Sequence, residues 1–445
     1  MDIASILTDS RKLTYILGGA IGLMVFVALI FILRSSVGSG AGTGAATIQV
    51  WGVFDDQTAF DAAIQSFEKA NKNISVEFKM IPTTQNYEQT LINALAAGTG
   101  PDVFMIHNSW LPKHIGKLAP LPAVAPGAKA PLMSIRQFQD TFVDVAYNDL
   151  VSSGKIYGMP LYVDTLALYY NKDLFSTAGI AQPPVTWNDF LDDVKKLTTY
   201  DASRNVIRSG AAIGSAHNVN RATDILMMLM LQSGVQMTNP DNTEATFAHS
   251  VDGQPVGENA LTFYTDFTNP QKEVYTWNES QDYSIDAFSA GKTAMMINYA
   301  HQMPIIQQKA SRLNWAVAPA PQASVNDKRT YADYWPLSVS GQSKYPNQAW
   351  QFVYYMTAGD GALAYLNATN RPTARRDLVS QQQSDPNLGV FAEQSLTARS
   401  WHQADDAAIE TIFSDMIDNV NLGRQSVTDA IKGAEDKTSV LMAGH

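Results

Sequence analysis

Cysteine is absent from the 445 residues of this sequence. Its absence excludes disulfide bonds, thiolate metal ligands, cysteine nucleophiles and any lipid anchor attached through cysteine. Charge is also scarce: 16% of the residues are charged, and the formal net charge is −11. An acidic chain without a Lys/Arg cluster that could neutralise phosphates is unsuited to nucleic acid. The 45% hydrophobic composition is enough for two domains with separate cores and argues against disorder.

Motifs of common enzymes are missing as well. The sequence has no HExxH and no GxSxG pattern, and its seven histidines lack the spacing of metal ligands. Residues 290–293 resemble the end of a phosphate-binding Walker A loop, but Asp286 occupies the position of the first glycine that this loop requires. We therefore expect no catalytic residue, no metal and no cofactor. One alternative stays open, because a glycosidase needs only two carboxylates that face each other across a cleft.

A long uncharged run, LTYILGGAIGLMVFVALIFIL, occupies residues 13–33. At about 1.5 Å per residue a helix of this length reaches about 30 Å, the thickness of the hydrocarbon core of a bilayer. The apolar part of a secretory signal is shorter, about 7 to 15 residues. We interpret the run as an uncleaved transmembrane anchor. A cleaved signal is the alternative, because the small residues Gly44, Ala45 and Ala46 follow.

Basic residues and composition predict how the anchor is placed. Arg11 and Lys12 precede the run and Arg34 follows it, which favours a cytoplasmic N-terminus at residues 1–12. Residues 34–47 are rich in Gly, Ser and Ala and should form a flexible linker. The sequence thus predicts a single-pass protein of the cell membrane with an extracytoplasmic globular body.

Asp164 stands alone within an apolar and aromatic stretch of the segment GKIYGMPLYVDTLALYYNKDLF, residues 154–175. A buried carboxylate without a partner costs several kcal/mol or becomes protonated. Asp164 therefore faces solvent, has a partner in the chain, or lines a cleft where a ligand supplies the partner. If it contacts a ligand, replacing it with alanine should weaken binding by about 1 to 3 kcal/mol.

Strand and helix signals alternate after the linker, at residues 47–51, 60–67, 76–80, 87–97 and 102–106. This order predicts a parallel sheet with helices on both faces. Capping-box patterns at Thr186 with Asp189, and at Ser426 with Asp429, predict the starts of two later helices. The predicted fold class is α/β.

Residues that follow the predicted strands are candidates for a binding site, because open α/β sheets bind ligands beyond the carboxyl ends of their strands. These candidates are Trp51, His107, Asn108, Ser109, Trp110, Tyr162, Asp164, Asn298, Tyr299 and His301. For any single aromatic residue, core packing is the better explanation. Their shared position at strand ends singles them out as a group.

Several segments together resemble a known family. They are IQVWGVFDDQTAFDAAIQSFEKAN after the linker, LAAGTGPDVFMI at 95–106, GKIYGMP and LYYNKDLFSTAGI around Asp164, PPVTWNDF at 183–190, FSAGKTAMMINY at 288–299 and WAVAPAP at 315–321. Their order and spacing resemble the extracellular solute-binding proteins of ABC importers, family 1, which are similar to maltose-binding protein. The resemblance covers nearly the whole body.

The resemblance implies a two-lobed periplasmic-binding-protein fold of type II, with three crossings between the lobes. The crossings are expected near residues 162–165, 331–335 and 376–380. The implied lobes are residues 48–163 with 336–378 for lobe 1, and 164–335 with 379–445 for lobe 2. The family's lipid-modified cysteine is missing, and the anchor would replace it.

The resemblance also implies roles for individual residues. Asp164 corresponds to a ligand-contacting carboxylate, and His301, with Tyr299 beside it, corresponds to an aromatic platform. Trp401 matches a second platform loosely. Arg371 lies in NRPTARRD with Arg375 and Arg376, where one arginine could meet an anionic ligand or an acidic partner; ordinary surface ion pairs are the favoured alternative. The full candidate set is Trp51, His107, Asn108, Trp110, Tyr162, Asp164, Asn218, Tyr299, His301, Trp335, Arg371 and Trp401.

The implied function is that of a membrane-anchored, monomeric solute-binding component of an ABC importer. It would capture a carbohydrate or oligosaccharide by hinge closure and deliver it to the permease subunits in the membrane. The alternatives are an extracytoplasmic ligand sensor and a carbohydrate-acting enzyme on the same scaffold.

Overall fold

The computed structural model describes residues 45–82, 84–124 and 130–443. The predicted tail 1–12, the anchor 13–33 and nearly all of the linker 34–47 lie outside the described residues. Strand β1 (Ala46–Gly52) begins one residue before the predicted end of the linker. Within the described ranges, no helix is both long and apolar enough to cross a bilayer.

A five-stranded sheet in the order β2-β1-β3-β14-β6 lies at the centre of the first lobe. Besides β1, its strands are β2 (Ile74–Met80), β3 (Val103–Met105), β14 (Pro336–Val339) and β6 (Gly158–Pro160). The parallel pairing of β1 with β2 and β3 was predicted and is confirmed. The complete sheet is mixed, because β14, which the sequence did not predict, runs antiparallel to both β3 and β6. Strand β14 enters this sheet from β13 of another sheet, so its direction does not follow the alternating order of β1 to β3.

A second five-stranded sheet, ordered β12-β8-β11-β10-β9, forms the centre of the second lobe. Its strands are β12 (Trp315–Pro319), β8 (Ala167–Asn171), β11 (Thr293–Asn298), β10 (Val206–Ala212) and β9 (Thr199–Tyr200). Only β10 and β11 pair in parallel; the other pairs are antiparallel. Every residue of β11 is buried, as expected for a strand that is covered on both faces.

A small sheet of three strands joins the lobes, and we call it the hinge sheet. It consists of β7 (Asp164–Thr165), β13 (Thr330–Asp333) and β15 (Ala398–Arg399), in the order β15-β13-β7. Two of the predicted crossings coincide with β7 and β13. The third does not: residues 376–380 lie in helix α15 (Arg376–Gln382), and the third strand of the hinge sheet comes later in the chain. Leu378 and Val379 are buried on α15, and Asp377 in its first turn suits the helix dipole.

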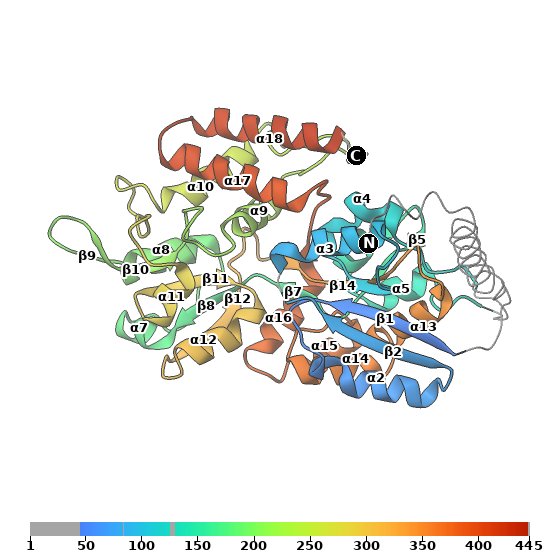
Figure 1. Ribbon diagram of the computed structural model, residues 1–445. Coiled ribbons are helices and arrows are strands. Elements are labelled where there is room, and N and C mark those ends of the chain that lie inside the picture. The colour runs from blue at the N-terminus through green and yellow to red at the C-terminus, as the bar shows by residue number, and fades with distance from the viewer. Residues whose placement is uncertain (1–44, 83, 125–129, 444–445) are drawn as a thin grey trace, which may run out of the picture. The chain divides into compact units, whose positions relative to one another are not determined.

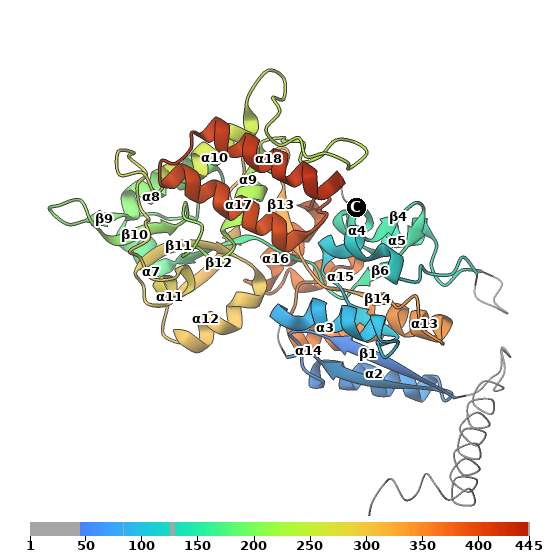
Figure 2. The ribbon, with the colours of Figure 1, turned by 45° about the horizontal axis from the view of Figure 1, so that its top comes forward.

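Helices pack against both large sheets. Those of the first lobe are α2 (Thr58–Ala70), α3 (Thr84–Ala96), α4 (Leu111–His114), α5 (Ile135–Thr141), α6 (Asp144–Leu150), α13 (Pro346–Thr357), α14 (Gly361–Thr369) and α15. Figures 1 and 2 show α3 on one side of β1, with α2 and α14 side by side on the other. A short hairpin, β4 (Val151–Ser152) with β5 (Lys155–Ile156), completes this lobe.

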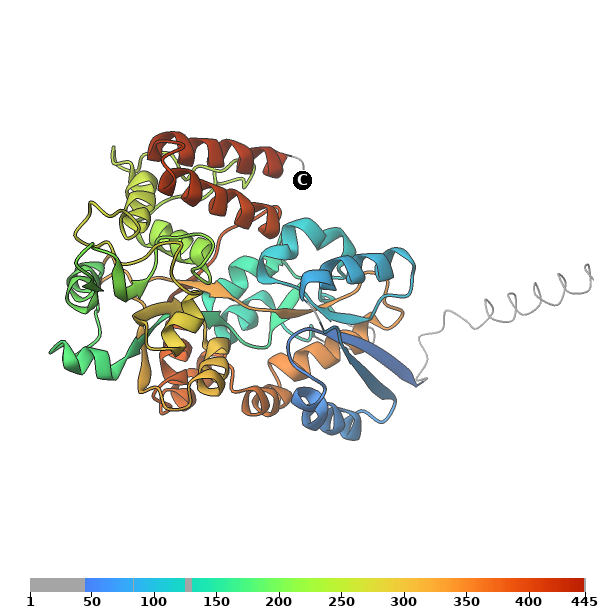
Figure 3. The same cartoon turned by 60° about the vertical axis from the view of Figure 1, so that its left-hand side comes forward.

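The second lobe is richer in helices. They are α7 (Lys172–Thr177), α8 (Trp187–Leu197), α9 (Ala222–Gln232), α10 (Val256–Asp266), α11 (Ser284–Ser289), α12 (Met303–Lys309), α16 (Leu388–Gln394), α17 (Asp406–Asn421) and α18 (Val427–Ala443). The capping box of Thr186 and Asp189 starts α8, as predicted, and Ser426 accepts a hydrogen bond from the Asp429 N–H at the start of α18. Figure 3 shows α17 and α18 packed side by side as an antiparallel pair.

Two separate hydrophobic cores follow from this arrangement. The chain leaves the first core after Val163 and joins the second at Leu166, and it returns between Tyr331 and Ala332. The hinge sheet therefore lies at the change from one core to the other. The remaining lobe boundaries stay predictions.

Candidate functional site

A cavity of about 230 Å³ lies between the lobes beside the hinge sheet, and we call it the central cavity. The first lobe contributes Phe54, His107, Asn108, Ser109 and Trp335; the hinge strand β13 contributes Tyr331 and Asp333; the second lobe contributes Arg221, Asp224, Met227, Trp401, Asp406 and Glu410, among others. Most of these residues follow a strand or start a helix, which is where open α/β folds place ligand-binding groups.

Aromatic rings from both lobes line the central cavity. The ring of Phe54 meets Trp335 edge to face at 5.3 Å between centroids, and Trp110 packs behind Trp335 at 5.0 Å. On the other lobe, the indole N–H of Trp401 points at the sulfur of Met227, 3.0 Å away. Such rings offer apolar faces next to polar groups, which is the usual composition of a small-molecule pocket.

Four carboxylates line the same cavity: Asp224, Asp333, Asp406 and Glu410. Arg221 lies among them, with Nη1 3.3 Å from Asp333 and 3.8 Å from Asp224. Burial favours the neutral form of Asp333, but the charge of Arg221 and a hydrogen bond from His107 outweigh it and hold the pKa of Asp333 well below its usual range. Burial raises the pKa of Asp224 to about 6, although Arg221 partly offsets this. The Nε of Arg221 is buried and has no partner among the described residues.

His107 connects the carboxylates to the first lobe. Its Nε2 lies 3.2 Å from Asp333, and its Nδ1 lies 2.6 Å from the Ser109 hydroxyl and 3.5 Å from Asp406. Burial lowers the pKa of His107, but the hydrogen bond with Asp333 and the charges of Asp333, Asp406 and Asp224 exceed that effect and raise it overall. The imidazole therefore carries charge more readily than an exposed histidine.

Asp164 does not line the cavities described here. Its side chain is 1% exposed, and its carboxylate accepts from the backbone N–H groups of Thr165 and Ala300 at 2.8 Å and of His301 at 3.1 Å. The last two begin the turn η4 (Ala300–Gln302), which leads into α12. Of the three options the sequence left for Asp164, this structure shows a partner within the chain. Contact with a ligand stays a prediction.

Four other predicted residues also lie away from the central cavity. Trp51 has the Lys79 ammonium 4.9 Å from its ring, and Tyr162 is buried beneath the guanidinium of Arg371. Asn218 donates to the carbonyl oxygens of residues 278 and 281 and so orders a loop. Tyr299 is fully buried and donates its hydroxyl proton to Asp224 at 2.9 Å, which places it one contact behind the cavity wall.

Arg371 and His301 line a different cavity of about 430 Å³ near β7. Arg371 binds Asp55 through Nη2 at 2.8 Å and Nε at 3.1 Å, and both side chains are nearly buried. Arg375 and Arg376 pair with Asp377 and Asp144 at the surface, as the alternative interpretation of this basic cluster predicted. Arg371 is therefore already paired in this structure with a carboxylate of its own chain.

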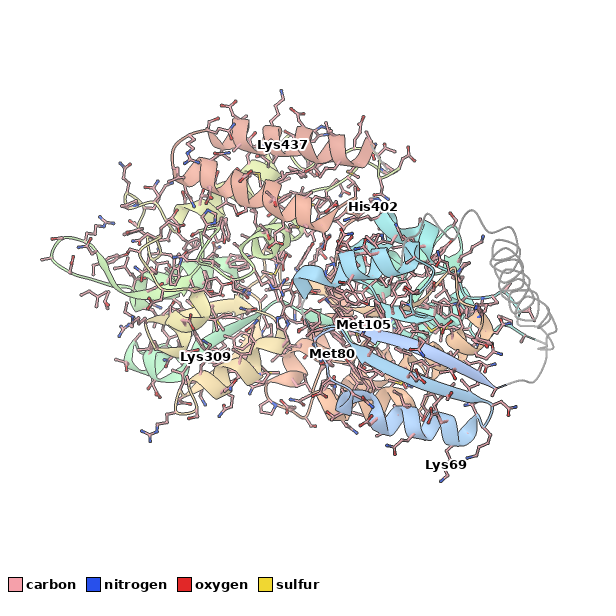
Figure 4. All side chains as sticks on the ribbon, viewed as in Figure 1. Lys69, Met80, Met105, Lys309, His402 and Lys437 are labelled. Carbon is pink, nitrogen blue, oxygen red and sulfur yellow. The ribbon has the colours of Figure 1, made fainter. Side chains whose placement is uncertain are left out.

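A larger side cavity of about 760 Å³ adjoins the central one, with which it shares Asn108, Ser109, Ser400, Trp401 and Gln403. Its walls come from α4, α6, residues 235–243 after α9, and the segment that leads into α17, where Figure 4 labels His402. Asp149 lines it and accepts hydrogen bonds from Asn108, Tyr334 and Ser400. Burial raises the pKa of Asp149 to about 6. Within the described part of the chain, no group of three or more His, Asp or Glu side chains could hold a metal ion.

The structure thus brings His107, Asn108, Trp335 and Trp401 together at the central cavity, with Trp110 directly behind. Six residues of the cavity were not among the predicted ones: Phe54, Arg221, Asp224, Asp333, Asp406 and Glu410. Two of these had a usable signal: Phe54 follows β1, which ends one residue later than predicted, and Asp333 lies within a predicted crossing. The others begin helices of the second lobe, and nothing in their local sequence points to the cleft.

Comparisons with known proteins agree with this architecture. A model of the family described as bacterial extracellular solute-binding protein matches residues 62–390. Relatives include a binding protein of Brucella abortus (strain 2308), 24% identical over 86% of this chain and 89% of that protein. The maltodextrin-binding protein MdxE of Bacillus subtilis is 25% identical over 84% of each chain. The sn-glycerol-3-phosphate-binding periplasmic protein UgpB of Salmonella typhimurium is 22% identical over 91% of this chain and 94% of its own.

Solved structures share the two-lobed fold. The sugar-binding protein MalE of Xanthomonas citri superposes with a TM-score of 0.73 at 20% identity, covering 89% of this chain and 98% of its own. An ABC transporter solute-binding protein of Thermotoga lettingae, bound with α-D-tagatose, gives a TM-score of 0.68 at 23% identity, over 89% of this chain and 100% of its own. These likenesses establish the fold.

Proposed function

Because the chain belongs to the family of bacterial extracellular solute-binding proteins, we propose that it is the solute-binding component of an ABC importer and that its ligand is a neutral carbohydrate. A member of this family binds its solute and is not an enzyme. The observation that carries the proposal is the central cavity, where aromatic rings of both lobes surround four carboxylates. Among the residues predicted from the sequence, we propose ligand contact only for those that line this cavity.

Sugar chemistry fits this lining. The C–H face of a pyranose ring packs on an aromatic face, here offered by Phe54, Trp335 or Trp401, and sugar hydroxyls donate to carboxylates. Asp406 and Glu410 line the cavity from α17; Asp406 already accepts from the Trp110 indole at 3.0 Å, and its second oxygen can accept from a ligand. The adjoining side cavity gives room for further sugar units of an oligosaccharide.

The charge of the cavity argues against phosphorylated ligands. UgpB is named for sn-glycerol 3-phosphate, whose phosphate would need several cationic donors. Here Arg221 and His107 face four carboxylates, so even with His107 protonated the lining stays negative. In a partly buried site, Coulomb's law with an intermediate dielectric constant gives a repulsion of several kcal/mol between a phosphate and nearby carboxylates. A neutral sugar meets none.

Binding should proceed by closure of the lobes on the hinge sheet. The chain segments in that sheet are two to four residues long, so small changes in few backbone dihedrals can rotate one lobe against the other. The ligand stabilises the closed form only by the contacts that it makes to both lobes at once. The rings and carboxylates that face each other across the central cavity are those contacts.

Membrane attachment is a further part of the proposal. Residues 13–33 would remain as an uncleaved anchor with residues 1–12 in the cytoplasm, and the linker 34–47 would hold a monomeric body near the permease subunits. The lobes would divide as predicted, at about residues 163, 335 and 378. Mass spectrometry of the mature N-terminus tests the anchor: a chain that begins after residue 33 contradicts it.

Calorimetry with a ligand panel tests the function. The full chain is titrated with neutral mono- and oligosaccharides and, as matched anions, with sn-glycerol 3-phosphate and glucose 6-phosphate. Because residues 13–33 are apolar, the protein is kept in a detergent without a sugar headgroup. We expect heat of binding with at least one neutral glycan and none with the phosphates. Binding of phosphates alone, or turnover of the glycan, contradicts the proposal.

A further inference from the structure

Phe54 is a large apolar side chain that the fold leaves exposed at the mouth of the site. Its side chain is 53% exposed and lines the central cavity. Trp335 supports it edge to face, which leaves the ring free on its other side. Single exposed apolar side chains are common, but this one stands at the wall of a cavity between the lobes, where an apolar face can contact a ligand.

The backbone at Phe54 is strained. Its φ of 66° lies in the left-handed region, and the N–H of Asp55 donates to the carbonyl of Val53 at 2.8 Å. A three-residue turn closed around a central residue with positive φ is the rare, strained form of the γ-turn. For a residue with a bulky side chain this conformation is unusual and persists only where the surroundings impose it.

A buried brace imposes the conformation. The carboxylate of Asp55 accepts hydrogen bonds from both Nε and Nη2 of Arg371, and one from the Tyr365 hydroxyl at 2.6 Å. Arg371 in turn lies over the ring of Tyr162 at 4.4 Å. The side chains of Arg371 and Asp55 are 12% and 13% exposed, so the pair is largely shielded from water. The brace ties the turn after β1 to the segment that precedes α15.

We propose that Phe54 is a stacking platform for the C–H face of a sugar ring, and that Arg371 is a positioning residue that holds this platform in the cavity through Asp55. The inference rests on the proposed function and adds the residue that contacts the ring. It also gives Arg371 a role that differs from direct contact with an anionic ligand. Strain at Phe54 is then the cost of presenting an apolar face to the ligand.

Substitution of Phe54 tests the platform. The probe is the tightest-binding member of a neutral panel that includes maltotetraose, mannobiose and tagatose, titrated into the full chain. Phe54→Ala should lower affinity about tenfold or more, and Phe54→Tyr, which keeps the ring, should stay within about threefold. Tyr283→Ala is the matched control, because Tyr283 is 41% exposed and lines none of these cavities. It should change nothing.

Phe54→Gly separates function from stability. Glycine adopts positive φ without steric cost, so this variant should melt at a higher temperature than Phe54→Ala while losing the same affinity. If Phe54 had only a structural role, its removal would lower the melting temperature without changing the affinity. Equal affinity of the wild type, Phe54→Ala and Phe54→Gly overturns the inference.

A double-mutant cycle tests the brace. Arg371→Lys, or the milder Tyr365→Phe if the first fails to fold, should weaken binding several-fold in the wild-type background and have no further effect in Phe54→Gly. Arg376→Lys, which alters a surface pair with Asp144, is the control. Equal losses in both backgrounds overturn the positioning role.

The failure of this inference can be distinguished from the failure of the proposed function. If the wild type binds no neutral glycan, both are wrong. If it binds a glycan but the affinity does not depend on Phe54, only this inference is wrong.

Discussion

Two carboxylates face each other across the hinge sheet and have different surroundings. Asp164 on β7 and Asp333 on β13 are register partners. Asp164 is 1% exposed and takes its hydrogen bonds mainly from backbone N–H groups, whereas Asp333 faces the side chains of Arg221 and His107 and lines the central cavity. Backbone donors are fixed by the fold, but side-chain donors can rearrange around a ligand. From this difference we predict that Asp164 stabilises the fold and that Asp333 takes part in ligand binding.

The largest expected effect comes from removing Asp164. Asp164→Ala leaves the N–H groups of Thr165, Ala300 and His301 without their acceptor in a buried site. We expect a loss of about 2 to 4 kcal/mol in the free energy of unfolding, measured by denaturant titration. Asp164→Asn keeps one acceptor oxygen and should lose less. A variant with full stability and weakened sugar binding would reverse the assignment and restore Asp164 as a ligand contact.

Replacing Asp333 with asparagine should change the pH dependence of stability and lower the affinity for the glycan. Its folded-state pKa is low, so the stability that it contributes is present above its ordinary value of 3.8 and disappears as pH falls below that range. The pKa of His107 is raised, so the contribution of its charge is complete below 6.5 and disappears as pH rises through the raised value. The stability difference between wild type and Asp333→Asn should therefore be greatest near pH 5 to 6, at about 1 to 2 kcal/mol.

NMR gives the direct readout for this variant. Without Asp333, the pKa of His107 should fall, because its hydrogen-bond partner and nearest charge are gone while Asp406 and Asp224 remain. Affinity for the glycan should fall as well, since Asp333 lines the central cavity and holds Arg221 and His107 there. A His107 titration curve that does not move contradicts the electrostatic coupling, and unchanged affinity contradicts the binding role.

The sequence allowed the fold to be predicted where the signal is local. The strand and helix order from β1 to β3 and the capping box before α8 depend on residues close in the chain, and the structure confirms them. Antiparallel β14 was missed because strand direction depends on the route through the hinge. Residues at strand ends, such as His107 and Asn108, reach the cavity as a consequence of topology. Arg221 and Asp224 reach it only because α9 packs against β13, a contact that no local pattern encodes.

The smallest expected effect lies at the rim of the cleft, away from the hinge sheet. Lys113 on α4 pairs at 2.8 Å with Asp405, which precedes α17 on the other lobe, and also with Glu88. In contrast to the hinge carboxylates, this pair is partly exposed, so it should contribute only about 0.2 to 1 kcal/mol to the contact between lobes.

Lys113→Met, which keeps the apolar stem, should therefore lower glycan affinity about two- to threefold at low salt, because the closed form loses a contact between lobes. The difference should vanish at about 1 M salt, where screening reduces the range of surface charges to about 3 Å. Lys309→Met is the control, since Lys309 pairs with Asp286 inside the second lobe. A loss that persists at high salt would mean that Lys113 acts through packing. A loss as large as that of Asp333→Asn would mean that the rim, as much as the hinge sheet, governs closure.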